Sequence, residues 1–145
     1  MQPSNSLANN FMSGELGITH FALHVADLDR SMAFYCGLLE LEERHRLEVE
    51  QAGLTEVFLG GPGAAGGMLD LIRVVGSEDR IVQNQDVLTH LTIQVPNLVE
   101  VRKRLADAGV AETMAHEVRG TLLLFVTDPD GYHVELIGPL NPKRA

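Results

Sequence analysis

Hydrophobic and polar positions along this chain alternate with a two-residue period, change to a helical period and then return to alternation. In the first alternating segment, 18–25, Phe21, Leu23 and Val25 lie between smaller or more polar residues, which is typical of a strand. Apolar residues then recur every three or four positions over 28–39, which predicts an amphipathic helix. Further alternation predicts three strands, at 41–51, 54–59 and 68–75.

The same order of periods returns in the second half of the chain. Asn97 is followed three residues later by Glu100, a capping-box arrangement that predicts the start of a helix. Gly109 is expected to end that helix, because glycine readily adopts the left-handed conformation found after helix ends. The predicted elements are a strand at 87–95, a helix at 98–108 and strands at 112–118, 121–127 and 132–138.

The residues repeat as well as the periods. The dipeptide Thr-His at 19–20 returns at 89–90, a spacing of 70 residues. Toward the end of each half the spacing is 65, because Asp-Leu-Ile at 70–72 corresponds to Glu-Leu-Ile at 135–137. An internal repeat of this kind predicts two copies of one structural unit, each built as strand, helix and three strands.

The length of 145 residues fits one domain made of these two units. We predict a flexible N-terminal tail at 1–16, a single domain at 17–138 and a C-terminal tail at 139–145. Within the domain we predict a first module at 17–75, a linker at 76–86 and a second module at 87–138.

Composition narrows the possible partners and location. The formal net charge of −9 argues against non-specific nucleic-acid binding. No apolar run approaches the roughly 18 residues of a membrane span, and the polar N-terminus lacks the apolar core of a signal peptide. The single cysteine, Cys36, excludes an internal disulfide and fits a reducing compartment. We therefore expect a cytoplasmic protein that binds neither nucleic acid nor membrane.

Each unit supplies a histidine on its first strand and a carboxylate on its last. The first unit has His20 and Asp70, and the second has His90 and Glu135. If the first and last strands of a unit pair as neighbours, its histidine and its acid lie on the same face. Two imidazoles and two carboxylates suit a divalent transition metal, with open positions left for water or substrate.

Taken singly, these residues have simpler explanations. A lone histidine on a strand is often structural, and Asp70 alone fits a salt-bridged acid. Glu135 lies on an apolar strand and needs a partner, which either Arg73 or Arg119 would provide. None of these explanations predicts a histidine and an acid at matched places in both units, so the repeat favours a metal site.

Two segments carry a family resemblance. They are Thr-His-Phe-Ala-Leu-His-Val-Ala-Asp-Leu-Asp-Arg-Ser-Met-Ala-Phe-Tyr at 19–35 and Asp-Pro-Asp-Gly-Tyr-His-Val-Glu-Leu-Ile at 128–137. With the order of elements, they resemble the vicinal oxygen chelate superfamily, which includes glyoxalase I, fosfomycin-resistance enzymes and extradiol dioxygenases. The resemblance implies an α+β fold, with two βαβββ modules in tandem forming an open, cup-shaped mixed sheet and helices on the outside. It also implies a homodimer, in which the modules closing one cup can come from different chains.

The resemblance also implies roles for individual residues. The glyoxalase I metal ligands correspond to His20, Asp70, His90 and Glu135, with Asp70 standing where glyoxalase I has Glu. The glyoxalase I arginine that binds glutathione corresponds to His24, which lacks a two-pronged donor. If Asp70 does not bind metal, the other three form the two-His-one-carboxylate set of the fosfomycin enzymes and iron dioxygenases.

The predicted function is that of a metal-dependent isomerase or lyase of glyoxalase I type. It would act on a small oxygen-chelating substrate through a metal-stabilised enolate, with one divalent ion per site (Ni, Co, Zn, Mn or Fe) and with Glu135 and Asp70 moving protons. The residues predicted to line the substrate pocket are His24, Gln94, Phe125 and His133. Two alternatives remain: a non-haem iron dioxygenase or fosfomycin-type transferase using three ligands, and a metal-free binding protein of bleomycin-resistance type.

Overall fold

The structure is a computed structural model that describes residues 20–63, 68–76, 90–118 and 120–140. The predicted N-terminal tail lies outside the described residues. So do nearly all of the predicted linker, most of the predicted C-terminal tail, and the first residues of the strands predicted at 18–25 and 87–95.

The order of elements confirms two βαβββ modules in tandem. The first module contains β1 (His20–His24), α2 (Leu28–Met32) with the continuing π-helical turn η1 (Ala33–Leu38), β2 (Glu42–Val49), the short 3₁₀ helix η2 (Glu50–Ala52), β3 (Leu54–Gly60) and β4 (Met68–Val74). The second contains β5 (Leu91–Gln94), α3 (Leu98–Asp107), β6 (Glu112–Val118), β7 (Thr121–Thr127) and β8 (His133–Pro139).

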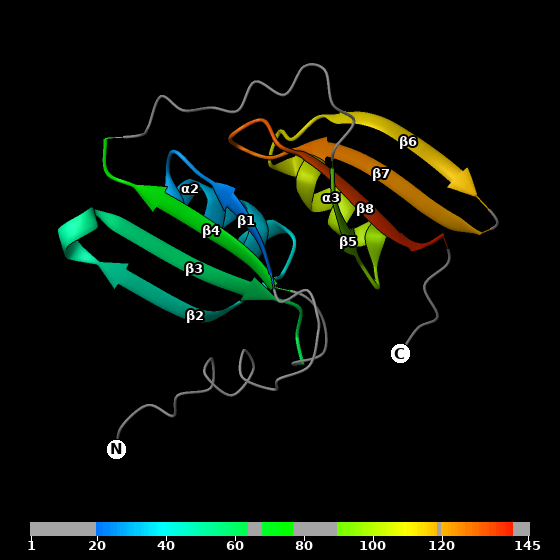
Figure 1. Cartoon of the computed structure of the whole chain (residues 1–145). Coiled ribbons are helices and arrows are strands. Elements are labelled where there is room, and N and C mark those ends of the chain that lie inside the picture. Colours follow the sequence, from blue (N-terminus) through cyan, green and yellow to red (C-terminus); the bar gives the residue numbers. More distant parts are fainter. Residues whose placement is uncertain (1–19, 64–67, 77–89, 119, 141–145) are drawn as a thin grey trace.

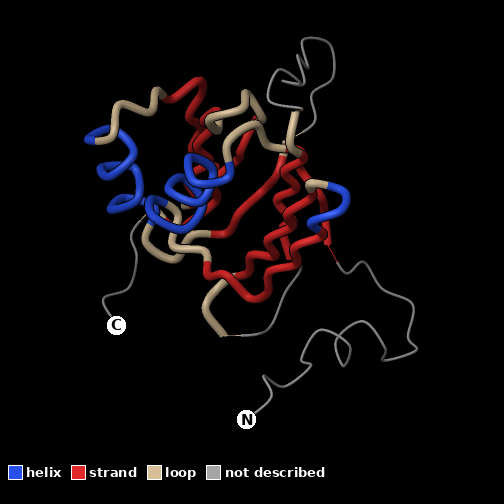
Figure 2. Tube along the Cα trace, turned by 90° about the vertical axis from the view of Figure 1, so that its left-hand side faces the viewer, coloured by secondary structure: helices blue, strands red, loops and turns tan. Residues whose placement is uncertain are grey.

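Each module forms its own open, mixed four-stranded sheet. The strand orders are β1-β4-β3-β2 and β5-β8-β7-β6, so the two modules have the same topology. The first and last strands of each module pair in parallel, and the other pairs are antiparallel. In Figure 1, β2 and β6 lie at opposite ends of the molecule, with α2 and α3 behind the sheets. Figure 2 shows the same helices gathered on one side of the strands.

Local sequence explains where both helices begin. The Asp27 side chain accepts a hydrogen bond from the Arg30 backbone N–H at 2.9 Å, as an N-cap should. Asn97 accepts one from the Glu100 backbone N–H at 3.3 Å, and its amide donates to the Glu100 carboxylate at 3.0 Å. The cap predicted at Asn97 is therefore confirmed, and Asp27 caps the first helix in the same way.

The first helix differs from its prediction in its second half. Helical spacing predicts one α-helix over 28–39, but the chain widens into a π-helical turn after Met32. The adjacent residues Phe34 and Tyr35 are both buried, and their rings contact edge to face with centroids 5.0 Å apart. Burial of both rings accompanies the change from an α-helical to a π-helical turn.

The apolar core lies between the sheets and their helices. Leu69 and Leu71 of β4 and Leu98, Val101 and Leu105 of α3 belong to one buried cluster that spans both modules. In the part of the chain that the structure describes, no helix is both long and apolar enough to cross a membrane.

A turn of the second module is bound to the helix of the first. Asp130 is 3% exposed and accepts hydrogen bonds from the Ala26 N–H (3.1 Å), the Arg30 guanidinium (3.2 Å) and the Ser31 hydroxyl (3.2 Å). Nearby, the buried Tyr35 hydroxyl donates to Asp128 at 2.8 Å. The Asp-Pro-Asp-Gly turn therefore fixes one module against the other as well as shaping its own strand connection.

Candidate metal centre

The second module brings its histidine and its acid into contact. The His90 Nε2 atom lies 3.1 Å from the Glu135 Oε2 atom. The Thr92 hydroxyl donates to the same carboxylate oxygen at 2.7 Å, because Thr92 and Glu135 are direct partners in the β5–β8 ladder. The Phe125 ring meets the His90 ring edge to face, with centroids 5.4 Å apart. Within the described residues, Glu135 therefore has polar neighbours but no arginine partner, and Arg119 lies outside them.

The first module has the same arrangement with different residues. Asp70 pairs with Ala22 across the β1–β4 ladder and with Phe58 across the β3–β4 ladder. The His20 ring meets the Phe58 ring edge to face, also with centroids 5.4 Å apart. Each sheet thus presents a histidine, an acid and a phenylalanine on the same face.

The Asp70 carboxylate is buried without a full set of partners. It is 2% exposed, and its Oδ1 atom has no hydrogen-bond partner. Burial, reinforced by the charge of Glu56 and partly offset by His20, raises the pKa of Asp70 to about 6. An unpartnered oxygen inside a protein is costly unless a proton or a cation satisfies it.

The four predicted ligands form two separate pairs in one chain. His20 and Asp70 lie on the first sheet, and His90 and Glu135 lie on the second. Among the residues that the structure describes, no three side chains of the metal-binding types come close enough together to hold an ion. One chain on its own therefore presents two separate pairs of a histidine and an acid, and we call each pair a half-site of the predicted metal centre.

The predicted pocket residues are distributed over both sheets. His24 ends β1, and its carbonyl accepts a 2.8 Å hydrogen bond from the Tyr132 hydroxyl. Gln94 ends β5 and is exposed, and His133 begins β8 and is exposed. Of the four, Phe125 is the one with a described contact to a predicted ligand, His90.

Sequence reasoning missed Phe58 and Thr92, which lie on these faces. Phe58 lies between Asp70 and His45 in the strand register, and the His45 ring lies 6.0 Å from it. Thr92 follows His90 by two residues, so alternation along the strand places both on one face. Phe58 and Phe125 stand at matched places in the strand register, opposite Asp70 and Glu135. Their spacing of 67 residues differs from both repeat spacings, 70 and 65, so the sequence repeat alone does not align them.

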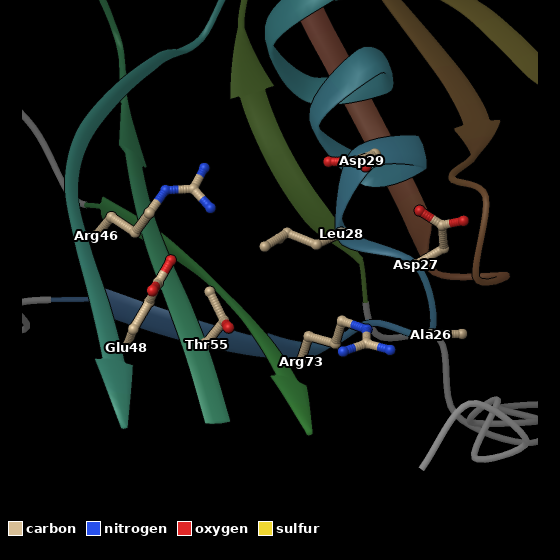
Figure 3. Close-up of a pocket in the computed structure, with 8 residues that line it drawn as sticks. All are labelled: Ala26, Asp27, Leu28, Asp29, Arg46, Glu48, Thr55 and Arg73. Carbon is tan, nitrogen blue, oxygen red and sulfur yellow. The ribbon is translucent and has the colours of Figure 1, made fainter. Parts of the chain in front are cut away.

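A cavity of about 460 Å³ lies elsewhere in the first module. Figure 3 shows that β2, β3, β4, the turn before α2 and the start of α2 line it. Its lining residues are Ala26, Asp27, Leu28, Asp29, Arg46, Glu48, Thr55 and Arg73. Thr55 and Arg73 alternate with Phe58 and Asp70 along their strands, so the cavity is on the helix side of the sheet and is separate from both half-sites.

Comparison with known proteins identifies the family. Residues 17–136 match the Glyoxalase/Bleomycin resistance protein/Dioxygenase superfamily. The chain belongs to this superfamily. It is 33% identical to the lactoylglutathione lyase of Salmonella typhimurium over 132 residues, covering 88% of this chain and 96% of that enzyme. The matches to lactoylglutathione lyases and to glyoxalase I show that the chain is an enzyme.

Solved structures support the same placement. The chain superposes on the trypanothione-dependent glyoxalase I of Leishmania major with a TM-score of 0.74 at 29% identity, covering 86% of this chain and 87% of that one. Glyoxalase I from Zea mays gives a TM-score of 0.70 at 26% identity. That match covers 85% of this chain but 47% of the maize chain, so this chain spans about half of the maize protein.

The residues present fit a divalent metal. The donor set is two imidazoles and two carboxylates, the nitrogen and oxygen ligands that such ions take in proteins. The buried Oδ1 atom of Asp70, which has no partner, is an observation that a bound cation would explain. Each histidine also packs against a phenylalanine, which limits the orientation of its ring.

Proposed function

We propose that this protein is a metal-dependent lyase or isomerase of glyoxalase type, acting on a small substrate with adjacent oxygen atoms. The observation that carries the proposal is the matched set of histidine, acid and phenylalanine on each sheet, His20, Asp70 and Phe58 on one and His90, Glu135 and Phe125 on the other. Two unrelated structural histidines would not be expected to have the same neighbours in both modules.

The ligands in this proposal are His20, Asp70, His90 and Glu135. When bound, the metal would supply positive charge that stabilises negative charge developing on the substrate oxygens. Asp70 and Glu135 are the candidate groups for taking and returning the proton next to those oxygens. Phe58 and Phe125 pack edge to face against the two histidine rings and limit their orientation.

We further infer that a complete site forms between two copies of the chain. The half-sites lie on different sheets, and each contains the free edge of its sheet, β1 or β5. Phe21, next to His20 on that edge, is 63% exposed although it is large and apolar, as expected for a residue covered in an assembly. The double length of the maize enzyme is also consistent with a functional unit that contains four modules.

Metal analysis and an activity assay test the proposal together. The protein, purified without a histidine tag, should contain or accept about one Ni, Co, Zn, Mn or Fe ion per chain. The loaded enzyme should convert the adduct of glutathione and methylglyoxal, an isomer of lactoylglutathione, or the adduct of another thiol. Because His24 occupies the place of the glutathione-binding arginine, other thiols are worth equal effort. Absence of stoichiometric metal, with activity unchanged in His90→Ala, would contradict the proposal.

Mixing two inactive variants tests the shared site. In a dimer with sites between chains, His20→Ala and His90→Ala each damage both sites of their own homodimer. A mixed dimer has one site with both changes and one site with neither, so random exchange should restore about a quarter of the original activity. Sites contained within single chains would give no recovery on mixing.

Further measurements separate the proposed function from its alternatives. Oxygen consumption with Fe(II) and catechols, absent with Ni(II) or Zn(II), would favour a dioxygenase that uses His20, His90 and Glu135 only. Tight binding of a small molecule by a protein with no metal would favour a binding protein. The lone Cys36 fits a reducing compartment, and the cytoplasm remains our expectation for where the enzyme works.

A further inference from the structure

The two acids of the candidate centre have equivalent backbone positions but different neighbours on the first strand. Asp70 faces Ala22 across the parallel β1–β4 ladder, and Glu135 faces Thr92 across the parallel β5–β8 ladder. On the other side both acids face a phenylalanine, Phe58 or Phe125. Among the strand neighbours of the two acids, the modules therefore differ at one place: the second has a hydroxyl beside its acid and the first has a methyl group.

That hydroxyl has a direct effect on the carboxylate. The Thr92 Oγ1 atom donates to Glu135 Oε2 at 2.7 Å, a short distance that is typical of a hydrogen bond to a charged acceptor. A β-branched side chain on a strand has few rotamers, so the hydroxyl is held where it is. The contrast is Asp70, whose Oδ1 atom is buried and has no hydrogen-bond partner.

We propose that Thr92 is a positioning residue for Glu135. Its hydroxyl fixes the carboxylate in one orientation beside His90, so that the acid meets an incoming metal without first reorganising. This inference rests on the proposed function, because it assigns Glu135 to the metal. It also distinguishes the two acids: Glu135 is prepositioned by the protein, whereas Asp70 depends on the metal or a proton to satisfy it.

Three variants test the role of the hydroxyl. Thr92→Val keeps the shape and removes the donor, and Thr92→Ser keeps the donor. Thr113→Val is the matched control, because Thr113 is also a strand threonine of the second sheet but donates to the Phe125 carbonyl. The readouts are the dissociation constants for Co(II) and Zn(II), measured by competition with a chelating dye, and the visible spectrum of bound Co(II). Thermal unfolding of the metal-free proteins checks that each variant folds.

Thr92→Val should weaken metal binding by about tenfold or more, as loss of a group that orients a ligand generally does. It should also change the Co(II) spectrum. Thr92→Ser should stay within about threefold of the original protein, and Thr113→Val should bind like it. If Thr92→Val binds metal as tightly as the original protein, or if the Val and Ser variants lose equal metal affinity, the proposed role of Thr92 is overturned. The proposed function would be unaffected by either result. An original protein that binds no metal would instead overturn the proposed function, and this inference with it.

Discussion

The two modules carry equivalent acids in unequal surroundings. Glu135 in the second module has Thr92 and His90 within hydrogen-bonding distance. Asp70 in the first is more deeply buried, has one oxygen without a partner, and has a raised pKa because of burial. A duplicated backbone therefore gives each module the same geometry, while single side chains decide how each acid is charged and held.

The contact between the two modules is also asymmetric. The turn of the second module inserts Asp128 and Asp130 against Tyr35, Ser31 and Arg30 of the first. Burial raises the pKa values of Asp128 and Tyr35, because it removes water from around both side chains. Hydrogen bonds within the protein take the place of that water. Contacts between residues about 100 positions apart thus set the position of β8 relative to the first helix.

The largest expected effect is on activity and comes from removing the charge of Glu135. Glu135→Gln keeps the size of the side chain and removes its charge. The activity of the metal-loaded enzyme should fall by about 10²–10⁴-fold, the usual contribution of a positioned acid or base, and metal affinity should fall as well. Glu117→Gln, on an exposed strand position, is the control and should change neither. An active Glu135→Gln enzyme would show that the acids do not have the roles proposed here.

The next largest effect comes from breaking the contact between modules. Asp130→Ala leaves the Ala26 N–H and the Ser31 hydroxyl without their acceptor in a buried place. The free energy of unfolding should fall by about 3 kcal/mol, measured by urea denaturation. Asp107→Ala removes an acid whose ion pair with Lys103 is exposed and screened by solvent, so it should cost much less than Asp130→Ala. Equal losses in the two variants would mean that the turn does not hold the modules together.

Removing the charge of Asp70 should stabilise the metal-free protein. A raised pKa means that folded Asp70 binds its proton more tightly than the unfolded chain does, so its contribution to stability declines as pH rises from about 4 to about 6. Asp70→Asn should therefore raise the free energy of unfolding by about 1–3 kcal/mol near pH 7.5 and by little near pH 4. Glu50→Gln, an exposed acid, should show no such difference between the two pH values. Urea denaturation at both pH values measures this, and a destabilised Asn variant near pH 7.5 would contradict it.

The smallest effect tests whether one side chain makes the modules unequal. Ala22→Thr places a hydroxyl beside Asp70, as Thr92 does beside Glu135. The metal-free protein should gain about 0.5–1.5 kcal/mol of stability near pH 7.5, the value of one hydrogen bond. Ala22→Val adds the same bulk without the donor and is the control. If the two variants change stability equally, the difference between the two acids comes from the shorter side chain of Asp70 rather than from the residue at position 22.

Much of this arrangement could be predicted from the sequence. Alternation along each strand put His20 and His90 on the same face as Asp70 and Glu135, because side chains on a strand point to opposite faces in turn. The repeat predicted two equal modules, and the cap at Asn97 was predicted from residue type and from its spacing to Glu100.

Other features depended on contacts that no local pattern records. The π-helical turn accompanies burial of both Phe34 and Tyr35, and the acceptor role of Asp130 depends on a helix about 100 residues away. The sequence by itself determined which side chains share a strand face and that the two modules are alike, since periodicity and repetition can be read directly along the chain. Only the tertiary structure decided that Glu135 is held by Thr92, that Asp70 is buried without a full set of partners, and that the two half-sites of one chain stay apart. Those outcomes depend on how strands far apart in sequence pair and pack.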